Sequence, residues 1–207
     1  SVSIIIYELC LYLKDQCFQL IRKKNSLESR RIVISGGPGT GKTSLISHLE
    51  KEGYKCMHEI SRDITIAAQK EGVSQLFLEK PLLFSEKLLE GRLQQFNDGF
   101  ISPEGCVFYD RGMPDITAYM DYIDSQYPSD FSKICSSNRY DAIFLLPPWK
   151  AIYRQDNERY ESFEQAEELH QFLVNSYKKF NYSVIEVPHG TIEERITFIL
   201  DKLKLLF

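Results

Sequence analysis

The 207-residue sequence has no long uninterrupted run of apolar residues, which excludes a membrane-spanning helix of ordinary length. The closest approach is SVSIIIYELCLYL at residues 1–13, where Glu8 interrupts the run, Lys14 and Asp15 end it, and no basic segment precedes it. A cleaved signal peptide is therefore not expected. Because the chain begins with Ser1 rather than Met, we expect a fragment or a processed form.

The sequence also lacks CxxC pairs and any His/Cys cluster with the spacing of zinc ligands, which argues against a zinc site. Its five cysteines are scattered and odd in number, a pattern typical of reduced thiols in a cytoplasmic protein. Positive charge is not in excess, and the formal net charge of −4 argues against a nucleic-acid partner. Internal repeats and low-complexity segments are absent as well.

From Arg31 onward the sequence alternates short apolar runs with longer helical patterns. The runs RIVIS, YKCMHE, GCVFYD, DAIFLLPP and SVIEVP predict five strands. Helices are predicted over residues 43–52, 81–98, 161–180 and 191–203. Pro81 suits a first helical turn, and Thr191 with Glu194 has the spacing of a capping box. This alternation predicts an α/β domain with a mostly parallel sheet.

We expect residues 31–207 to form this domain and residues 1–30 to form an N-terminal amphipathic helix and linker. Apolar side chains recur with helical spacing at Ile6, Leu9, Leu13, Cys17, Leu20 and Ile21. Such a helix packs on the domain, forms a dimer contact, or binds a partner protein, and the spacing does not choose among these alternatives.

The segment GGPGTGKT fits the pattern GxxxxGK[ST], with a strand before it and a helix after it, which is the context that a phosphate-binding loop requires. Backbone N–H groups of such a loop and the helix N-terminus bind phosphates, the lysine contacts the β- and γ-phosphates, and the threonine hydroxyl binds Mg²⁺. The sequence therefore predicts an ATP and Mg²⁺ site formed by Gly36, Gly37, Pro38, Gly39, Thr40, Gly41, Lys42, Thr43 and Ser44. An NKxD guanine-reading motif is missing, which argues against a GTPase switch.

Asp110 ends the apolar run CVFYD, as the acidic residue of a Walker-B strand does, and is a predicted magnesium ligand together with Thr43. The alternative is that Asp110 only caps the following loop. The next residue is Arg111, whereas motor ATPases commonly place a carboxylate there to activate water. Arginine stays protonated and cannot be that base, but it suits a phosphate or an acceptor.

Glu59 follows the second predicted strand in MHEISRD, at the edge of the sheet where ligands bind in parallel α/β folds. It is the candidate base that accepts the proton of an attacking hydroxyl. Arg62 could orient the acceptor. The alternative is a surface pair between Glu59 and Arg62 at i,i+3.

After the fourth predicted strand, PPWKAIYRQDNERYESF carries Lys150, Arg154 and Arg159 in a polar stretch. We interpret it as a lid whose cations stabilise a transferring phosphoryl group and whose closure excludes water. A solvated loop is the alternative. Tyr153 and Tyr160 fit either lid packing or base stacking. His189, in VPHGT after the last strand, either contacts the nucleobase or is an ordinary surface residue.

Taken together, ISGGPGTGKTSLI, HEISRDI, FYDRGMPDITAY, FLLPPWKAIYRQDNERYESFEQA and VIEVPHGTIEERITFIL resemble the AAA-domain family of predicted P-loop ATPases and kinases. That family is similar to the kinase domain of the bifunctional ribosylnicotinamide kinase and NAD-biosynthesis regulator. The resemblance runs from about Arg31 to the C-terminus and does not include the predicted N-terminal helix.

The resemblance implies a nucleoside-kinase-like fold with strand order 2-3-1-4-5 and without the helical second domain of AAA+ motors. Deoxynucleoside kinases have a base and a D/E-R pair whose roles would fall on Glu59, Asp110 and Arg111. The resulting hypothesis is a kinase that transfers the ATP γ-phosphate to a small nucleoside- or nucleotide-like acceptor. Its expected catalytic residues are Lys42, Glu59, Asp110, Arg111, Arg154 and Arg159, and its expected acceptor-binding residues are Glu59, Arg62 and Arg111. The alternative is a regulatory nucleotide-binding module or slow ATPase that signals to a protein partner.

Overall fold

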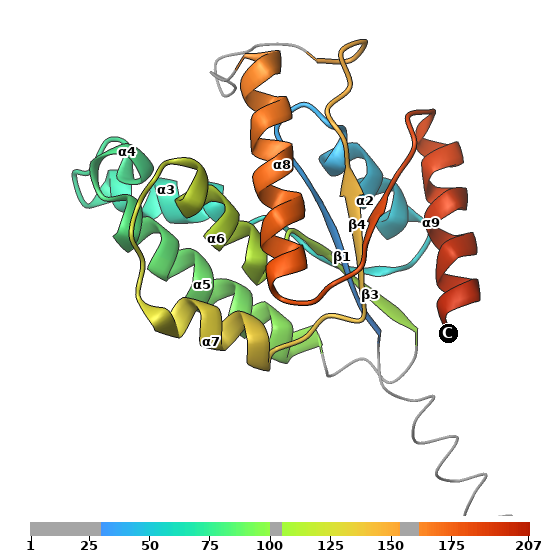
Figure 1. The fold of residues 1–207 in the computed structure, drawn as a ribbon, viewed down its shortest axis with the longest axis horizontal. Helices are drawn as coiled ribbons and strands as arrows, with labels where there is room; N and C mark the ends of the chain where they lie inside the picture. The colour runs from blue at the N-terminus through green and yellow to red at the C-terminus, as the bar shows by residue number, and fades with distance from the viewer. Residues whose placement is uncertain (1–29, 100–104, 154–161) are drawn as a thin grey trace, which may run out of the picture.

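The computed structural model describes residues 30–99, 105–153 and 162–207. In this part of the chain, five parallel strands form one sheet in the order β2-β3-β1-β4-β5, and helices lie on both of its faces (Figure 1). The predicted α/β class and the strand order implied by the resemblance are both confirmed. The predicted N-terminal helix and linker lie outside the described residues except for Arg30.

All five predicted strands are present, although the two edge strands are shorter than the apolar runs that predicted them. The strands are β1 (Arg30–Gly36), β2 (Lys55–Met57), β3 (Cys106–Asp110), β4 (Ala142–Leu146) and β5 (Val184–Glu186). In the register of the sheet, Ile34 lies opposite Asp110, and Gly36 lies opposite Leu146. The carboxyl ends of the three central strands therefore meet at one edge, where the phosphate-binding loop begins.

The helices of the described residues are α2 (Lys42–Lys51), α3 (Ser61–Lys70), α4 (Leu76–Glu79), α5 (Pro81–Asp98), α6 (Met113–Tyr122), α7 (Ser129–Ser137), α8 (Phe163–Lys179) and α9 (Ile192–Leu206). Helix α5 begins at the proline that predicted its first turn. The predicted capping box also forms, because the Thr191 hydroxyl accepts from the Glu194 N–H while the Glu194 carboxylate accepts from the Thr191 N–H.

The sheet has a separate hydrophobic core on each face because its side chains alternate in direction. In β1, Val33 packs into the core formed with helices α3 to α8, whereas Ile32 and Ile34 pack into the core formed with α2 and α9. Figure 1 shows α2 and α9 side by side on their face of the sheet, and the two helices are in contact. This pairing places the first turn of α9 next to the phosphate-binding loop.

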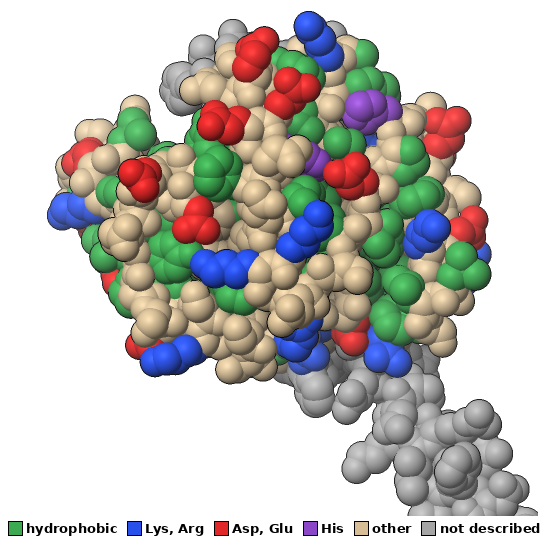
Figure 2. Space-filling model, viewed as in Figure 1, with side chains coloured by type: hydrophobic (Ala, Val, Ile, Leu, Met, Phe, Trp, Pro, Cys, Tyr) green, Lys and Arg blue, Asp and Glu red, His purple; other side chains and the backbone are tan. Residues whose placement is uncertain are grey.

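On the face drawn in Figure 2, acidic and basic side chains of the described residues are interspersed over the helices. Within the described ranges, no helix is long and apolar enough to cross a membrane.

Candidate active site

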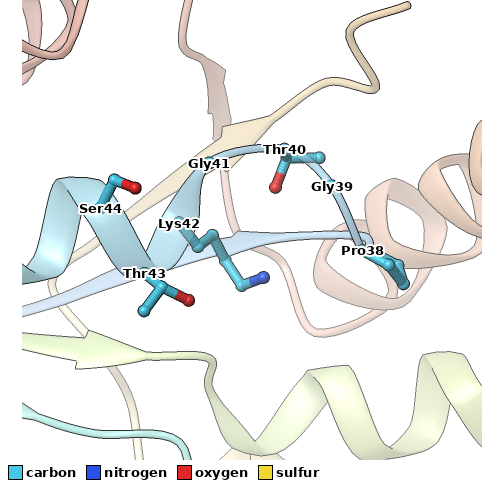
Figure 3. Close-up of a pocket in the computed structure, with 7 residues that line it drawn as sticks. All are labelled: Pro38, Gly39, Thr40, Gly41, Lys42, Thr43 and Ser44. Carbon is cyan, nitrogen blue, oxygen red and sulfur yellow. The ribbon is translucent and has the colours of Figure 1, made fainter. Parts of the chain in front are cut away.

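The loop between β1 and α2 encloses a cavity of about 190 Å³, lined by Pro38, Gly39, Thr40, Gly41, Lys42, Thr43 and Ser44. Figure 3 shows Lys42 and Thr43 on the same side of the first turn of α2, with Ser44 on the other side. The Thr40 hydroxyl donates to the Gly37 carbonyl oxygen over 3.0 Å and closes the loop internally. The structure therefore places seven of the nine predicted loop residues, those at 38–44, around one concave site, whereas Gly36 and Gly37 are not among the residues that line it.

Three glycines of this loop, Gly36, Gly39 and Gly41, have a positive φ, and at two of them a Cβ would also come closer than 3.0 Å to other atoms. Gly36 has φ 146°, and a Cβ there would lie 2.6 Å from the carbonyl oxygen of Leu146 on the neighbouring strand. Gly39 has φ 72°, and a Cβ there would lie 2.9 Å from the ring of Tyr153. Tyr153 also makes an edge-to-face contact with Phe163, so in this structure it packs against the loop.

Lys42 is partly buried, and its Nζ lies 3.5 Å from the Gly37 carbonyl oxygen. Burial and, next, the nearby charge of Arg111 lower the pKa of Lys42 to about 8, although Asp110, Glu59 and Asp115 act in the opposite direction. An anionic ligand would favour the charged form of this amine, so the residue is suited to binding phosphate.

Asp110 and Thr43 fit the requirements of a magnesium ion bound together with a nucleotide. Asp110 is 7% exposed, and its Oδ1 is buried without a hydrogen-bond donor among the described residues. The predicted ligands offer a carboxylate and a hydroxyl, the oxygen donors that Mg²⁺ takes when phosphates and waters complete its shell. Within the described ranges, no group of three or more His, Cys, Asp or Glu side chains could hold a metal by itself.

Glu59 lies two residues beyond the end of β2, and its carboxylate is fully engaged. One oxygen, Oε1, accepts from the N–H groups of Ile60 and Ser61 at 2.9 and 3.1 Å. Arg92 Nη2 contacts both carboxylate oxygens at 3.1–3.2 Å, and Arg111 Nε lies 2.7 Å from Oε2. Burial alone would raise the pKa of Glu59, but Arg92, Arg111, the Ser61 N–H and the charge of Lys42 lower it to about 2.

The sequence analysis missed Arg92, which extends from the middle of α5 to the same site. Its side chain is 4% exposed, and its Nη1 donates to the Gly112 carbonyl oxygen over 2.8 Å. The sequence pattern does indicate that Arg92 is buried, since Leu88, Arg92 and Phe96 follow one another at intervals of four along one face of the helix. An arginine in such a row requires a buried partner, and here that partner is Glu59.

Arg111 has the left-handed φ of 74°, which is uncommon for a residue with a side chain. The Arg111 Nη1 lies 3.5 Å from Asp115 Oδ1 but has no hydrogen-bond acceptor among the described residues. Asp115 is fully buried and accepts hydrogen bonds from the Ser35 hydroxyl, the Gly112 N–H and the Tyr177 hydroxyl. This carboxylate, also missed by sequence analysis, joins the arginine to the end of β1 and to α8.

The predicted lid is described only in part, since Arg154, Arg159 and Tyr160 lie outside the described residues. Lys150 is exposed, with its Nζ 5.7 Å from the centre of the Phe163 ring. His189 stacks on Trp149 with ring centres 5.0 Å apart and an angle of 5° between the planes. Arg62 is exposed in the first turn of α3.

A family model described as an AAA domain matches residues 31–195, well over half of the chain. Comparison with curated proteins found no match.

Solved structures of kinases share the fold. Deoxyadenosine kinase from M. mycoides, solved with dCMP and dCDP, is 17% identical with a TM-score of 0.61, and the match covers 84% of this chain and 98% of that one. Thymidylate kinase from Candida albicans is 17% identical with a TM-score of 0.60 over 86% of this chain and 92% of that one.

The NadR protein, solved with NAD and AMP-PNP, is 19% identical with a TM-score of 0.65, and the match covers 86% of this chain and 49% of that one. The chain thus spans about half the length of NadR. At these identities the likeness shows the fold alone.

Proposed function

Because the chain belongs to the AAA-domain family matched over residues 31–195, we propose that it is a phosphotransferase within that family. It would transfer the γ-phosphate of ATP to a hydroxyl or phosphate of a small nucleoside- or nucleotide-like acceptor. The fold, shared with nucleoside and nucleotide kinases, agrees with this activity.

One observation carries the proposal. Beside the phosphate-binding loop, Asp110 Oδ1 is buried without a donor and Arg111 Nη1 is buried without an acceptor among the described residues. Buried polar atoms are normally satisfied, so this pair is suited to a ligand that brings both a cation and an anion. A magnesium–nucleotide complex brings both.

In the proposed reaction, Lys42 and Arg111 donate to phosphate oxygens and stabilise the charge that develops during transfer. Thr43 and Asp110 would hold Mg²⁺, which neutralises phosphate charge when bound. Glu59 keeps Arg111 in place in this structure. To act as the base as well, Glu59 would have to lose at least one of its donors when the acceptor binds.

The engaged state of Glu59 favours one alternative, a regulatory nucleotide-binding module or slow ATPase. A carboxylate with a pKa of about 2 and several donors is a weak proton acceptor. In that case nucleotide turnover would be slow and would not depend on an acceptor.

ADP release from Mg·ATP separates these functions. The assay is run alone and against nucleosides, nucleotides and vitamin ribosides, with Lys42→Ala as the blank. Release that rises with one acceptor class supports the kinase and identifies that class. Slow release that no acceptor changes contradicts the kinase and favours the regulatory module.

A further inference from the structure

Arg195 is a buried arginine without a carboxylate partner among the residues that the structure describes. It lies in the first turn of α9 and is 3% exposed. Its Nη2 donates to the carbonyl oxygen of Thr40 over 2.9 Å, and its Nε is buried without a hydrogen-bond partner among the described residues. The neighbouring carboxylate of Glu194 instead accepts from the Thr191 N–H.

The other two arginines of the site, Arg92 and the partly buried Arg111, differ from Arg195 in this respect. Arg92 and Arg111 are each paired with Glu59, and Arg111 also lies near Asp115. Burial lowers the pKa of Arg195, and in the described part of the chain no charged neighbour offsets that effect. A guanidinium held out of water costs free energy unless an anion balances it, so this charge calls for a negative partner from outside the described residues.

The geometry limits where that partner binds. A Cβ on Gly41 would lie 3.0 Å from Arg195 Nη1, so the guanidinium lies directly against the backbone of the phosphate-binding loop. Arg195 does not line the loop cavity, which is formed by residues 38–44. The charge is therefore separated from the cavity by the thickness of one peptide chain.

We propose that Arg195 belongs to the nucleotide site as a positioning residue behind the loop, where its charge is balanced by the phosphates of a bound nucleoside triphosphate. The inference rests on the nucleotide site of the proposed function. The hydrogen bond to Thr40 fixes one carbonyl of the loop away from the phosphates, and the guanidinium attracts the anion through the loop.

Arg195→Gln removes the charge and, because glutamine is shorter than arginine, also the hydrogen bond to Thr40, so Arg195→Lys is compared with it to isolate the effect of the charge. Calorimetric titrations with ATP, ADP and AMP in the presence of Mg²⁺ measure the effect. Loss of one positive charge that acts on the phosphates through the loop corresponds to roughly a tenfold rise in Kd for ATP, and we expect smaller rises for ADP and AMP because they carry fewer phosphates. Arg195→Lys keeps the charge and should bind ATP within about threefold of the unaltered protein.

The melting temperature of the nucleotide-free protein distinguishes this proposal from a purely structural role, because a structural role predicts that Arg195→Gln lowers it. Replacing an unbalanced buried charge should leave the melting temperature unchanged or raise it. Arg139→Gln is the matched control, since Arg139 also donates to backbone carbonyls, those of Phe180 and Asn181, far from the loop in sequence. It should lower the melting temperature and leave all three affinities unchanged.

Equal binding of ATP by Arg195→Gln and the unaltered protein would overturn the proposal. So would a lowered melting temperature or unfolding of nucleotide-free Arg195→Gln, or equal losses for ATP, ADP and AMP, because each would assign Arg195 a structural role. If the unaltered protein binds no ATP, the proposed function itself fails, and that result is seen before any variant is compared.

Discussion

Replacing Glu59 with glutamine removes a carboxylate that contacts both Arg92 and Arg111, at 3.1 and 2.7 Å. The pKa of Glu59 is lowered from 4.5 to about 2, which corresponds to about 3 kcal/mol of folding free energy at neutral pH. Removing one partner of a buried ion pair costs a similar amount, about 3–5 kcal/mol. We therefore expect Glu59→Gln to lower the free energy of unfolding by about 3 kcal/mol at pH 7.

The pH dependence of this loss provides a check on its cause. Because the pKa in the folded state is depressed, the contribution of Glu59 is fully present above about pH 4.5 and is lost as the pH falls toward 2. About 2 kcal/mol of the difference between the unaltered protein and Glu59→Gln should be gone at pH 3. Urea unfolding at pH 7, 5 and 3 measures it.

Glu50→Gln is the matched control, because Glu50 pairs with His58 at 2.7 Å but both side chains are about half exposed. Its cost should stay below about 1 kcal/mol at pH 7. A loss for Glu59→Gln no larger than that of Glu50→Gln, or a loss that does not change between pH 7 and pH 3, would refute the assignment of Glu59 as a partly buried ionic centre.

Three further predictions concern the loop and the buried carboxylate of α6. Because Lys42 has a pKa of about 8 without ligand, its amine is mostly neutral near pH 8.5, and ATP binding there should be accompanied by proton uptake. Titration calorimetry in buffers of different ionisation enthalpy detects this uptake, and Lys42→Ala should abolish it. Asp115→Asn should lower kcat at least tenfold with little change in the KM for ATP, because it releases Arg111. Thr117→Val also removes an α6–α8 hydrogen bond, as Asp115→Asn does, but should lower only stability. Equal kinetics for the two variants would contradict the role of Asp115. Gly36→Ala should abolish ATP binding, because its Cβ would overlap the Leu146 carbonyl, and retained affinity in a filter-binding assay would contradict the loop geometry.

The sequence predicted those parts of the fold whose signals are local. Strand and helix order follows from apolar periodicity, and the start of α9 follows from a capping box only four residues long. The phosphate-binding loop can also be predicted from local sequence, since residues 36–43 determine its shape within one short segment. Predictions of this kind need no knowledge of distant residues.

The lengths of the edge strands could not be predicted because a partner decides them. The run YKCMHE continues to Glu59, but pairing ends at Met57, opposite Tyr109 of β3. Beyond that point the Glu59 carboxylate accepts from the Ile60 and Ser61 N–H groups and the chain enters α3. The residue selected as the end of a strand is therefore the residue that starts the next turn.

The missed site residues share one physical property, in that each is a buried charge whose partner is far away in the sequence. Arg92 pairs with Glu59, Asp115 accepts from Ser35, and Arg195 donates to Thr40 across 155 positions. Apolar periodicity treats each of them as an interruption of a helix face. Because burying a charge costs free energy, such an interruption is itself evidence for a distant partner or a ligand. For Arg92 the partner is Glu59, whereas for Arg195 we propose that it is the bound nucleotide.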